Sequence, residues 1–247
     1  MHAQTLAGRT ALVTGAARGL GSAISRWLAG LGARVALGDV DADALAEAAR
    51  SIHNQGGETV CCVFDVSDAA AVRSAFAAIG RVEILVNNAG ICPLTPPEEI
   101  DEAEWDRVLS VNLKGAFLCT QAAMPGLRTA GWGRVINLAS AAGQMGGVAV
   151  GVHYAASKGG LLAMTKSFAR LLAPFGATVN AIAPGAAETD LTAGWPEPVR
   201  QDLRTKVPLG RLIQPEEVAA VVAFLCSPEA AAITGATIDV NAGLLMR

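Results

Sequence analysis

The sequence predicts one α/β domain in which a doubly wound parallel sheet is flanked by helices. Short, continuous apolar runs alternate with longer helical patterns along all 247 residues, and no linker or shift in composition interrupts them. Strands that are covered on both faces form continuous apolar runs, whereas half-exposed strands alternate between apolar and polar residues. Because strands alternate with helices, right-handed crossovers between parallel strands are expected.

Composition places the chain among globular proteins with a large apolar core. Hydrophobic residues make up 52% and charged residues 17%, which excludes a disordered chain. The net charge of -3 gives no electrostatic reason to expect nucleic acid or an anionic membrane as a partner. The first ten residues hold no apolar signal segment, and the five cysteines form no C-x-x-C pair. A cytoplasmic protein with reduced thiols, no metal and no membrane span is therefore expected.

Seven apolar runs are expected to form the strands: Thr10–Thr14, Arg34–Gly38, Thr59–Phe64, Ile84–Asn87, Arg134–Leu138, Thr178–Ala183 and Thr237–Val240. The stretches with helical character between them include Leu20–Leu31, Ala42–Asn54, Ala69–Ile79, Glu102–Arg128, Tyr154–Leu172 and Pro215–Leu225. The segment Thr189–Pro208 differs, because it is rich in proline, contains Trp195 and lacks a clear apolar period. Either a mobile lid or an ordinary surface loop fits this segment.

The first expected strand runs directly into a glycine-rich turn, and a helix follows. Gly15, Gly19 and Gly21 form a Gly-x-x-x-Gly-x-Gly pattern at this strand-to-helix junction. Glycines allow the backbone to approach a phosphate closely, and a helix N-terminus attracts the anion. The position of the pattern near the start of a strand–helix–strand unit predicts a dinucleotide site.

Acidic residues follow the second and third expected strands. Asp39 can accept hydrogen bonds from the adenosine ribose hydroxyls and would repel a 2′-phosphate, which favours NAD over NADP. Arg18 acts against this preference, since a guanidinium in the glycine loop could bind a 2′-phosphate. Asp65 could hydrogen-bond adenine, or it could cap the next helix, as could Ser67 or Asp68.

Ser140, Tyr154 and Lys158 form the candidate chemical centre. Tyr154, the only tyrosine of the chain, and Lys158 are four residues apart, so both lie on one face of a helix. A tyrosine has a pKa of about 10, and a nearby ammonium favours the phenolate. Lowering this pKa by roughly three units needs about 4 kcal/mol of differential stabilisation. With a serine hydroxyl to hold an oxygen, the trio suggests proton transfer to or from an alcohol or carbonyl.

These motifs together resemble those of the classical short-chain dehydrogenases/reductases, from Thr14 to about Gly243. The matching pieces, in the family's order and intervals, are Thr14-Gly15-Ala16-Ala17-Arg18-Gly19-Leu20-Gly21, Asn87-Asn88-Ala89-Gly90, Asn112, Ser140, Tyr154 to Lys158, and Pro184-Gly185 followed by Thr189. The family has a Rossmann-type sheet of seven parallel strands. The resemblance implies a dinucleotide-binding part at about residues 8–140, a catalytic part at about 140–247, and a lid at about 189–208.

The resemblance also implies roles for individual residues. Tyr154 would be the general acid/base, Lys158 would lower its pKa and bind the nicotinamide ribose, and Ser140 would orient the substrate oxygen. Asn112 would hold a water in a proton relay. The implied cofactor contacts are Gly15, Arg18, Gly19, Leu20, Gly21, Asp39, Asp65, Val66, Asn88, Ala89, Gly90, Tyr154, Lys158, Pro184, Gly185, Ala187 and Thr189. Many members are tetramers, so a homotetramer with contacts along Glu102–Arg128 and Tyr154–Leu172 is expected.

Two departures from the family pattern bear on the substrate. Ala186 and Ala187 follow Pro184-Gly185 where a bulkier residue is common, which would enlarge the pocket or loosen the packing of the nicotinamide. His153 precedes Tyr154 where small residues are frequent, so it is either structural or in contact with substrate. The segments Ala142–His153 and Ala187–Val207 are expected to line a partly hydrophobic pocket.

An NAD-dependent oxidoreductase that acts on a secondary alcohol or its ketone is the leading hypothesis. An NADPH-dependent 3-oxoacyl-(acyl carrier protein) reductase is the alternative; Asp39 and the net charge disfavour it, although Arg128, Arg134 and Arg170 could form a local docking patch. A non-catalytic dinucleotide sensor would have no need of all four of Asn112, Ser140, Tyr154 and Lys158. Epimerases and dehydratases of the family's extended branch are longer than this chain.

Overall fold

The computed structural model describes residues 5–147 and 150–246. Seven strands form one parallel sheet in the order β3-β2-β1-β4-β5-β6-β7. They are β1 (Thr10–Thr14), β2 (Arg34–Asp39), β3 (Glu58–Val63), β4 (Ile84–Asn87), β5 (Gly133–Leu138), β6 (Ala177–Pro184) and β7 (Thr237–Val240). The predicted doubly wound, Rossmann-type sheet is thereby confirmed. The strand order reverses at β1, which pairs with both β2 and β4, and ligands of such sheets bind beside this reversal.

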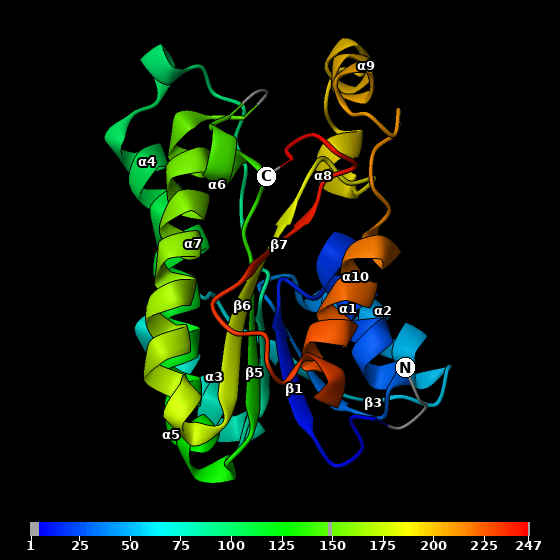
Figure 1. Ribbon diagram of the computed structural model, residues 1–247, viewed down its shortest axis with the longest axis vertical. Coiled ribbons are helices and arrows are strands. Elements are labelled where there is room, and N and C mark those ends of the chain that lie inside the picture. The colour runs from blue at the N-terminus through cyan, green and yellow to red at the C-terminus, as the bar shows by residue number, and fades with distance from the viewer. Residues whose placement is uncertain (1–4, 148–149, 247) are drawn as a thin grey trace.

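Helices cover both faces of the sheet (Figure 1). One layer consists of α1 (Gly19–Gly30), α2 (Ala42–His53) and α10 (Pro215–Cys226). The other layer consists of α3 (Ala69–Ile79), α4 (Glu102–Leu109), α5 (Gly115–Ala130) and α7 (Val152–Leu172). Three shorter helices, α6 (Ala142–Met145), α8 (Asp190–Ala193) and α9 (Glu197–Lys206), follow β5 and β6. They lie beyond the carboxyl ends of these strands (Figure 1).

Successive residues of the central strands pack into two separate apolar cores. Ala11 and Val13 of β1 belong to the core shared with α1, α2 and α10, whereas Leu12 belongs to the core shared with α3, α5 and α7. All three side chains are fully buried. Because side chains alternate between the faces of a strand, a strand covered on both faces is apolar at most positions. This explains the continuous apolar runs in the sequence.

The structure corrects two of the expected elements. The single helix expected over Glu102–Arg128 is α4, a π-helical turn at Ser110–Lys114, and α5. The segment Thr189–Pro208, which shows no apolar period, contains α8 and α9. Val148 and Ala149, within the stretch expected to line a pocket, lie outside the described residues.

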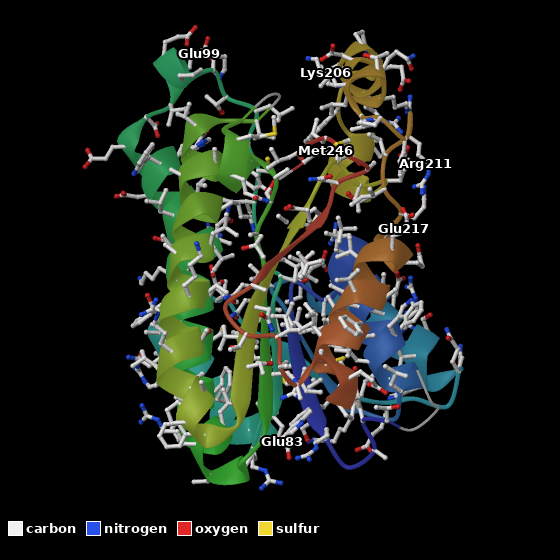
Figure 2. All side chains as sticks on the ribbon, viewed as in Figure 1. Glu83, Glu99, Lys206, Arg211, Glu217 and Met246 are labelled. Atoms are coloured by element: carbon white, nitrogen blue, oxygen red, sulfur yellow. The ribbon has the colours of Figure 1, made fainter. Side chains whose placement is uncertain are left out.

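Charged side chains gather at the amino-terminal ends of β1, β4 and β5. Glu83 is 2% exposed and forms an ion pair with Arg9 at 3.2 Å. The Arg9 guanidinium lies 4.3 Å from the centre of the Trp132 ring, and the Arg134 guanidinium lies 4.4 Å from it. Figure 2 shows Glu83 at the opposite end of the molecule from Lys206. Arg134 is itself only 2% exposed, so it cannot contribute to the surface docking patch that the sequence allowed.

None of the helices in the described ranges combines the length and apolarity that a membrane crossing requires. The five cysteines are all free.

Candidate active site

A cleft of about 710 Å³ lies along the carboxyl ends of the strands. The loops after β1 to β6 all contribute to its walls. The sequence-predicted residues that line it are Gly15, Arg18, Gly19, Leu20, Asp39, Asp65, Val66, Asn88, Ala89, Gly90, Ser140, Tyr154, Lys158, Pro184, Gly185, Ala187 and Thr189. Two predicted residues, Gly21 and Asn112, do not line the cleft but contact residues that do.

The glycine loop after β1 is shaped by close backbone contacts. Gly15 has a φ of +64°, and a Cβ there would lie 2.9 Å from the Cα of Ala89. A Cβ at Gly21 would lie 2.0 Å from the carbonyl oxygen of Gly15, so only glycine fits. The role of Gly21 is therefore to let α1 start directly beneath the loop. The amide groups in the first turn of α1 have no partners within the helix, which favours an anion at this point.

Asn88 ties the glycine loop to the end of β4. Its side-chain Nδ2 donates to the carbonyl oxygens of Thr14 at 2.9 Å and Gly15 at 3.0 Å. The Thr14 Oγ1 accepts from the backbone amides of Asn88 and Ala89, each at 3.1 Å. Asn88 thus holds the loop as well as lining the cleft. Asn87 points into the core instead, where its Nδ2 donates to Asn137 Oδ1 at 2.8 Å.

Asp39 lies at the end of β2 and faces the glycine loop. Its Oδ2 accepts from the Ala17 amide at 3.1 Å, and its Oδ1 accepts from the Val40 amide at 2.8 Å. These bonds fix the carboxylate at the cleft wall. Arg18 forms an ion pair with Asp41, so a neighbouring carboxylate already neutralises this guanidinium.

Asp65 follows β3 and pairs with a residue that the sequence did not single out. Its Oδ1 accepts from the Ser67 amide at 2.8 Å, and its Oδ2 meets the Arg107 guanidinium at 3.2 Å. Hydrogen bonds from Ser67 and the charge of Arg107 outweigh the effect of burial and lower the pKa of Asp65. Asp68 caps α3, so Asp65 is left to face the cleft.

Asn112 sits in the π-helical turn, where the helix is locally wider. It is 1% exposed; its Oδ1 accepts from the Ile91 amide at 2.8 Å, and its Nδ2 donates to the Ile91 carbonyl at 2.9 Å. The same Nδ2 donates to Ser157 Oγ at 3.1 Å. A Cβ on Gly90 would lie 3.3 Å from Asn112 and 3.5 Å from the Lys158 Nζ, so these groups surround one point behind the cleft wall.

Ser140, Tyr154 and Lys158 meet between the end of β5 and the first turns of α7. Lys158 is 4% exposed, its Nζ donates to the Leu138 carbonyl at 2.7 Å, and this Nζ lies 5.6 Å from the centre of the Tyr154 ring. The Ser140 Oγ accepts from the Ala142 amide at 3.1 Å, which fixes this oxygen at the end of β5. The three side chains face a single small space, as the sequence spacing indicates.

Burial controls the ionisation of this centre. Loss of water raises the pKa of Tyr154 above 10.0, the nearby Cys92 adds to the rise, and a hydrogen bond from Ser140 opposes it. Burial lowers the pKa of Lys158 to about 8, and Cys92 opposes that shift. In the protein alone, burial therefore has the largest effect on the pKa of Tyr154, and the lowering of this pKa by Lys158 stays a prediction.

His153 does not contact the cleft, although the sequence left this open. It is fully buried, its Nε2 lies 2.9 Å from Glu104 Oε1, and its ring stacks on Trp105 with centroids 6.4 Å apart. It therefore joins α7 to α4. Gly143, which the sequence analysis did not select, brings α6 against α7, because a Cβ there would lie 2.6 Å from the Lys158 backbone.

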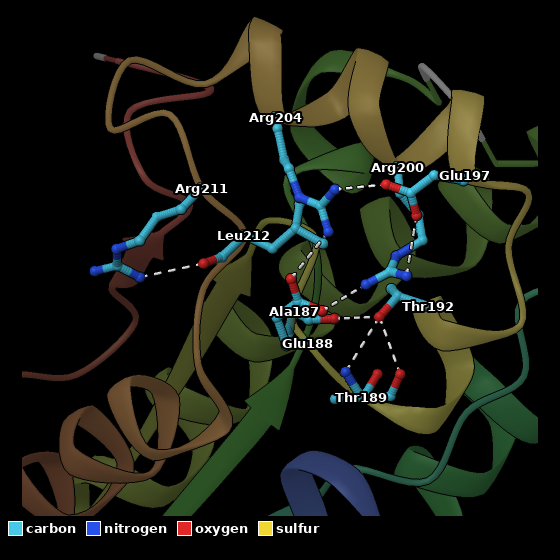
Figure 3. A network of polar contacts seen from close by, with 9 residues as sticks. All are labelled: Ala187, Glu188, Thr189, Thr192, Glu197, Arg200, Arg204, Arg211 and Leu212. Atoms are coloured by element: carbon cyan, nitrogen blue, oxygen red, sulfur yellow. Dashed lines mark hydrogen bonds and ion pairs between the residues drawn. The ribbon is translucent and has the colours of Figure 1, made fainter.

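The expected lid segment carries a network of ion pairs (Figure 3). Arg200 of α9 meets Glu188 at 2.9 Å and Glu197 at 3.2 Å, while Arg204 meets Glu197 at 2.8 Å and Glu188 at 3.5 Å. Glu188 comes directly before Thr189, so these ion pairs connect α9 to the start of the segment. The lining residues from this segment are Thr189, Thr192, Trp195 and Leu203.

Comparisons with known proteins agree with this geometry. A family model described as Enoyl-(Acyl carrier protein) reductase matches residues 15–245. A cis-4-hydroxycyclohexanecarboxylate dehydrogenase of Sinomonas cyclohexanicum is 41% identical over 245 residues, which cover 97% of this chain and 98% of the relative. A 3-oxoacyl-[acyl-carrier-protein] reductase of Pseudomonas aeruginosa is 41% identical over 246 residues, with 98% and 99% covered.

Solved structures give the same result. A 3-oxoacyl-[acyl-carrier protein] reductase of Brucella melitensis superposes with a TM-score of 0.95 at 36% identity, covering 99% of this chain and 94% of its own. A structure from the same organism with bound NAD gives a TM-score of 0.93 at the same identity and coverage. The chain therefore belongs to the classical short-chain dehydrogenases/reductases, oxidoreductases that act on CH–OH groups with a nicotinamide dinucleotide.

Proposed function

We propose that the protein is an NAD-dependent oxidoreductase that interconverts a secondary alcohol and its ketone. The observation that carries this proposal is the Asp39 carboxylate, which lines the same cleft as Ser140, Tyr154 and Lys158. A carboxylate at the end of β2 favours ribose hydroxyls and repels a 2′-phosphate. Arg18, the cation that would favour NADP, is paired with Asp41.

The lining of the cleft fits a nicotinamide dinucleotide. The glycine loop and the first turn of α1 would hold the pyrophosphate, with Asp39 on the adenosine ribose and Asp65 and Val66 beside adenine. Asn88, Ala89 and Gly90 would line the middle of the cleft, and Pro184, Gly185, Ala187 and Thr189 would contact the nicotinamide. When bound, the nicotinamide accepts or supplies the hydride, and its oxidised form brings a positive charge.

The protein's own side chains transfer the proton. In oxidation the Tyr154 oxygen takes the hydroxyl proton of the alcohol, and in reduction it returns a proton to the ketone oxygen. Ser140 donates its hydroxyl hydrogen to the substrate oxygen and orients it. Lys158 stabilises the phenolate and reaches the nicotinamide ribose, and Asn112 holds a water behind Lys158 that reloads the proton.

Initial rates test the cofactor and the reaction together. With a panel of secondary alcohols, kcat/KM should be at least about tenfold higher with NAD than with NADP, which is roughly 1.4 kcal/mol. Equal or better use of NADP would contradict the proposal for Asp39. Absence of turnover with either cofactor on alcohols and ketones would contradict the reaction itself.

A second candidate, an NADPH-dependent 3-oxoacyl-(acyl carrier protein) reductase, rests on the names of several relatives. Exposed Arg128 and Arg170 remain available on α5 and α7 for an acidic carrier. Faster NADPH-dependent reduction of a 3-oxoacyl carrier protein than NAD-dependent oxidation of any alcohol would favour this candidate.

We also propose a homotetramer that uses the outer faces of α5 and α7. Phe117 on α5 is 41% exposed and Leu171 on α7 is 55% exposed, which favours association of apolar surface. Sedimentation equilibrium measures the mass directly, and a monomer at micromolar concentration would contradict this proposal.

A further inference from the structure

The two ends of the cleft differ in charge. The end beside β2 and β3 is lined by Arg18, Asp39, Asp41, Asp65 and Arg107. The end beyond Ser140 and Tyr154 is lined mainly by Cys92, Ala142, Met145, Val150, Trp195 and Leu203. Burial raises the pKa of the Cys92 thiol to about 12, so it is neutral there at physiological pH.

Lys158 is the one cation among the described residues that line this second end, and it is already engaged. Its Nζ donates to the Leu138 carbonyl at 2.7 Å, and the side chain is 4% exposed. The two guanidinium groups of the lining, Arg18 and Arg107, are at the other end and are paired with Asp41 and Asp65. None of these cations is placed to receive a negative group on a substrate.

The cations of the lid segment are paired as well. Arg200 and Arg204 share Glu188 and Glu197, as Figure 3 shows, and neither lines the cleft. Lys206 meets Asp202 at 2.5 Å. A substrate carboxylate entering beneath α8 and α9 would therefore meet mainly apolar side chains and no free cation among the described lining residues. Moving an ionised carboxylate from water into such surroundings is strongly unfavourable unless a cation compensates.

We propose that the natural substrate is an uncharged ketone or secondary alcohol on an apolar carbon frame, either alicyclic or a thioester-linked acyl chain. The inference rests on the proposed oxidoreductase function. It separates this chain from its relative named for cis-4-hydroxycyclohexanecarboxylate, whose printed substrate carries a carboxylate. Ala186 and Ala187, both small, leave space for such a frame beside Gly185.

Matched pairs of substrates test the charge directly. One pair is methyl cis-4-hydroxycyclohexanecarboxylate and its free acid, assayed with NAD. The other is the N-acetylcysteamine thioester of 3-oxooctanoate and free 3-oxooctanoate, assayed with NADH. The neutral member should exceed its acid at least about tenfold in kcat/KM, and the more active pair identifies the alicyclic or acyl source.

The outcomes separate this inference from the function beneath it. A free acid that matches or exceeds its neutral partner would overturn the inference while the oxidoreductase function stands. No turnover of any of the four compounds, together with none across the wider alcohol panel, would overturn both.

A variant provides an independent test of the missing cation. Met145 of α6 lines the cleft and is 43% exposed, so a longer charged side chain can be placed there without burial. Met145→Lys should raise kcat/KM for the free acid relative to its ester by about tenfold, whereas the matched control Met145→Leu should leave that ratio unchanged. An equal ratio in both variants would contradict the inference, because an added charge would then have no effect on the acid.

Discussion

The two ends of the cleft are constructed in different ways. At the end beside β2 and β3, where we propose that adenosine binds, the backbone fixes the polar groups. Asp39 accepts from two amides, and a Cβ added at Gly21 would lie only 2.0 Å from the Gly15 oxygen. At the substrate end, apolar side chains from α6, α9 and the C-terminal segment form the walls. A site fixed by backbone geometry suits one cofactor, whereas walls of side chains on short helices can change substrate without disturbing the sheet.

The largest effect is expected where the two ends meet, at Tyr154. Tyr154→Phe removes the hydroxyl and keeps the ring, so turnover should fall about a hundredfold or more while NADH binding persists. Turnover and the quenching of NADH fluorescence should be measured on the same preparation. Retained turnover would remove Tyr154 from the proposed mechanism, and lost NADH binding would place the residue in cofactor binding instead.

Removing a single carboxylate charge near the glycine loop should change the preference between NAD and NADP. Asp39→Ala should reduce the NAD preference by about tenfold, or about 1.4 kcal/mol, because the ribose acceptor and the repulsive charge are both lost. Asp41→Asn should raise NADP use by freeing Arg18, while its amide oxygen still caps α2, where Asp41 accepts from the Ala44 amide at 3.1 Å. Unchanged kcat/KM ratios in both variants would show that neither carboxylate sets the cofactor choice.

Sequence motifs predict the adenosine end better than the substrate end. Gly15, Gly21 and Asp39 act through the local backbone, so their spacing after a strand is informative. Arg107 contacts Asp65, and Ser157 contacts Asn112; the two residues of each pair are more than forty positions apart in the chain. No local sequence pattern predicts such pairs.

The lid helix was missed for another physical reason. Ion pairs join its Arg200 and Arg204 to Glu188 and Glu197, and among the described side chains of α9 only Leu203 is buried. A helix with a single buried residue has few apolar side chains from which a 3.6-residue pattern could be recognised. The effect of burial on the pKa of Tyr154 could not be predicted either, because a sequence shows the neighbouring ammonium but not the extent of burial.

Lys158 links activity to stability. Its pKa falls from 10.5 in the unfolded chain to about 8 in the folded protein, so below about pH 8 the fold carries a buried charge that costs about 3 kcal/mol. That cost decreases as the pH rises from about 8 and vanishes above about 10.5. Lys158→Met removes the charge but leaves the Leu138 carbonyl without this donor, which costs about 1–3 kcal/mol.

The net result of Lys158→Met should be a gain of about 1 kcal/mol at pH 7, or about 2–4 °C in Tm, together with loss of activity. Thermal unfolding without cofactor at pH 7 and pH 10 measures it. The gain should shrink at pH 10, where the natural lysine is largely neutral. A lower Tm at pH 7 would mean that the ammonium stabilises the fold, contrary to its lowered pKa.

The smallest effect is expected at Trp195, at the outer wall of the substrate end. Trp195 lines the cleft and is partly exposed, and the segment Thr189–Pro208 is held at its base by part-exposed ion pairs, each worth about 0–1 kcal/mol. We propose that this segment opens without ligand and closes over bound cofactor and substrate, which excludes water. Trp195→Ala should then raise KM severalfold for bulky apolar substrates and change little for small polar ones.

Hydrogen exchange separates a moving lid from a fixed wall. In the lid case, amides of Thr189–Pro208 exchange rapidly in the protein alone and slow when NADH and a ketone analogue bind, while amides of β5 are protected in both states. The Trp195 ring would also lose its contact with solvent on closure, so its fluorescence should shift to shorter wavelength, a change absent from Trp195→Phe. Equal, strong protection of the segment in both states would rule out the lid and leave Trp195 as a packing residue of the cleft wall.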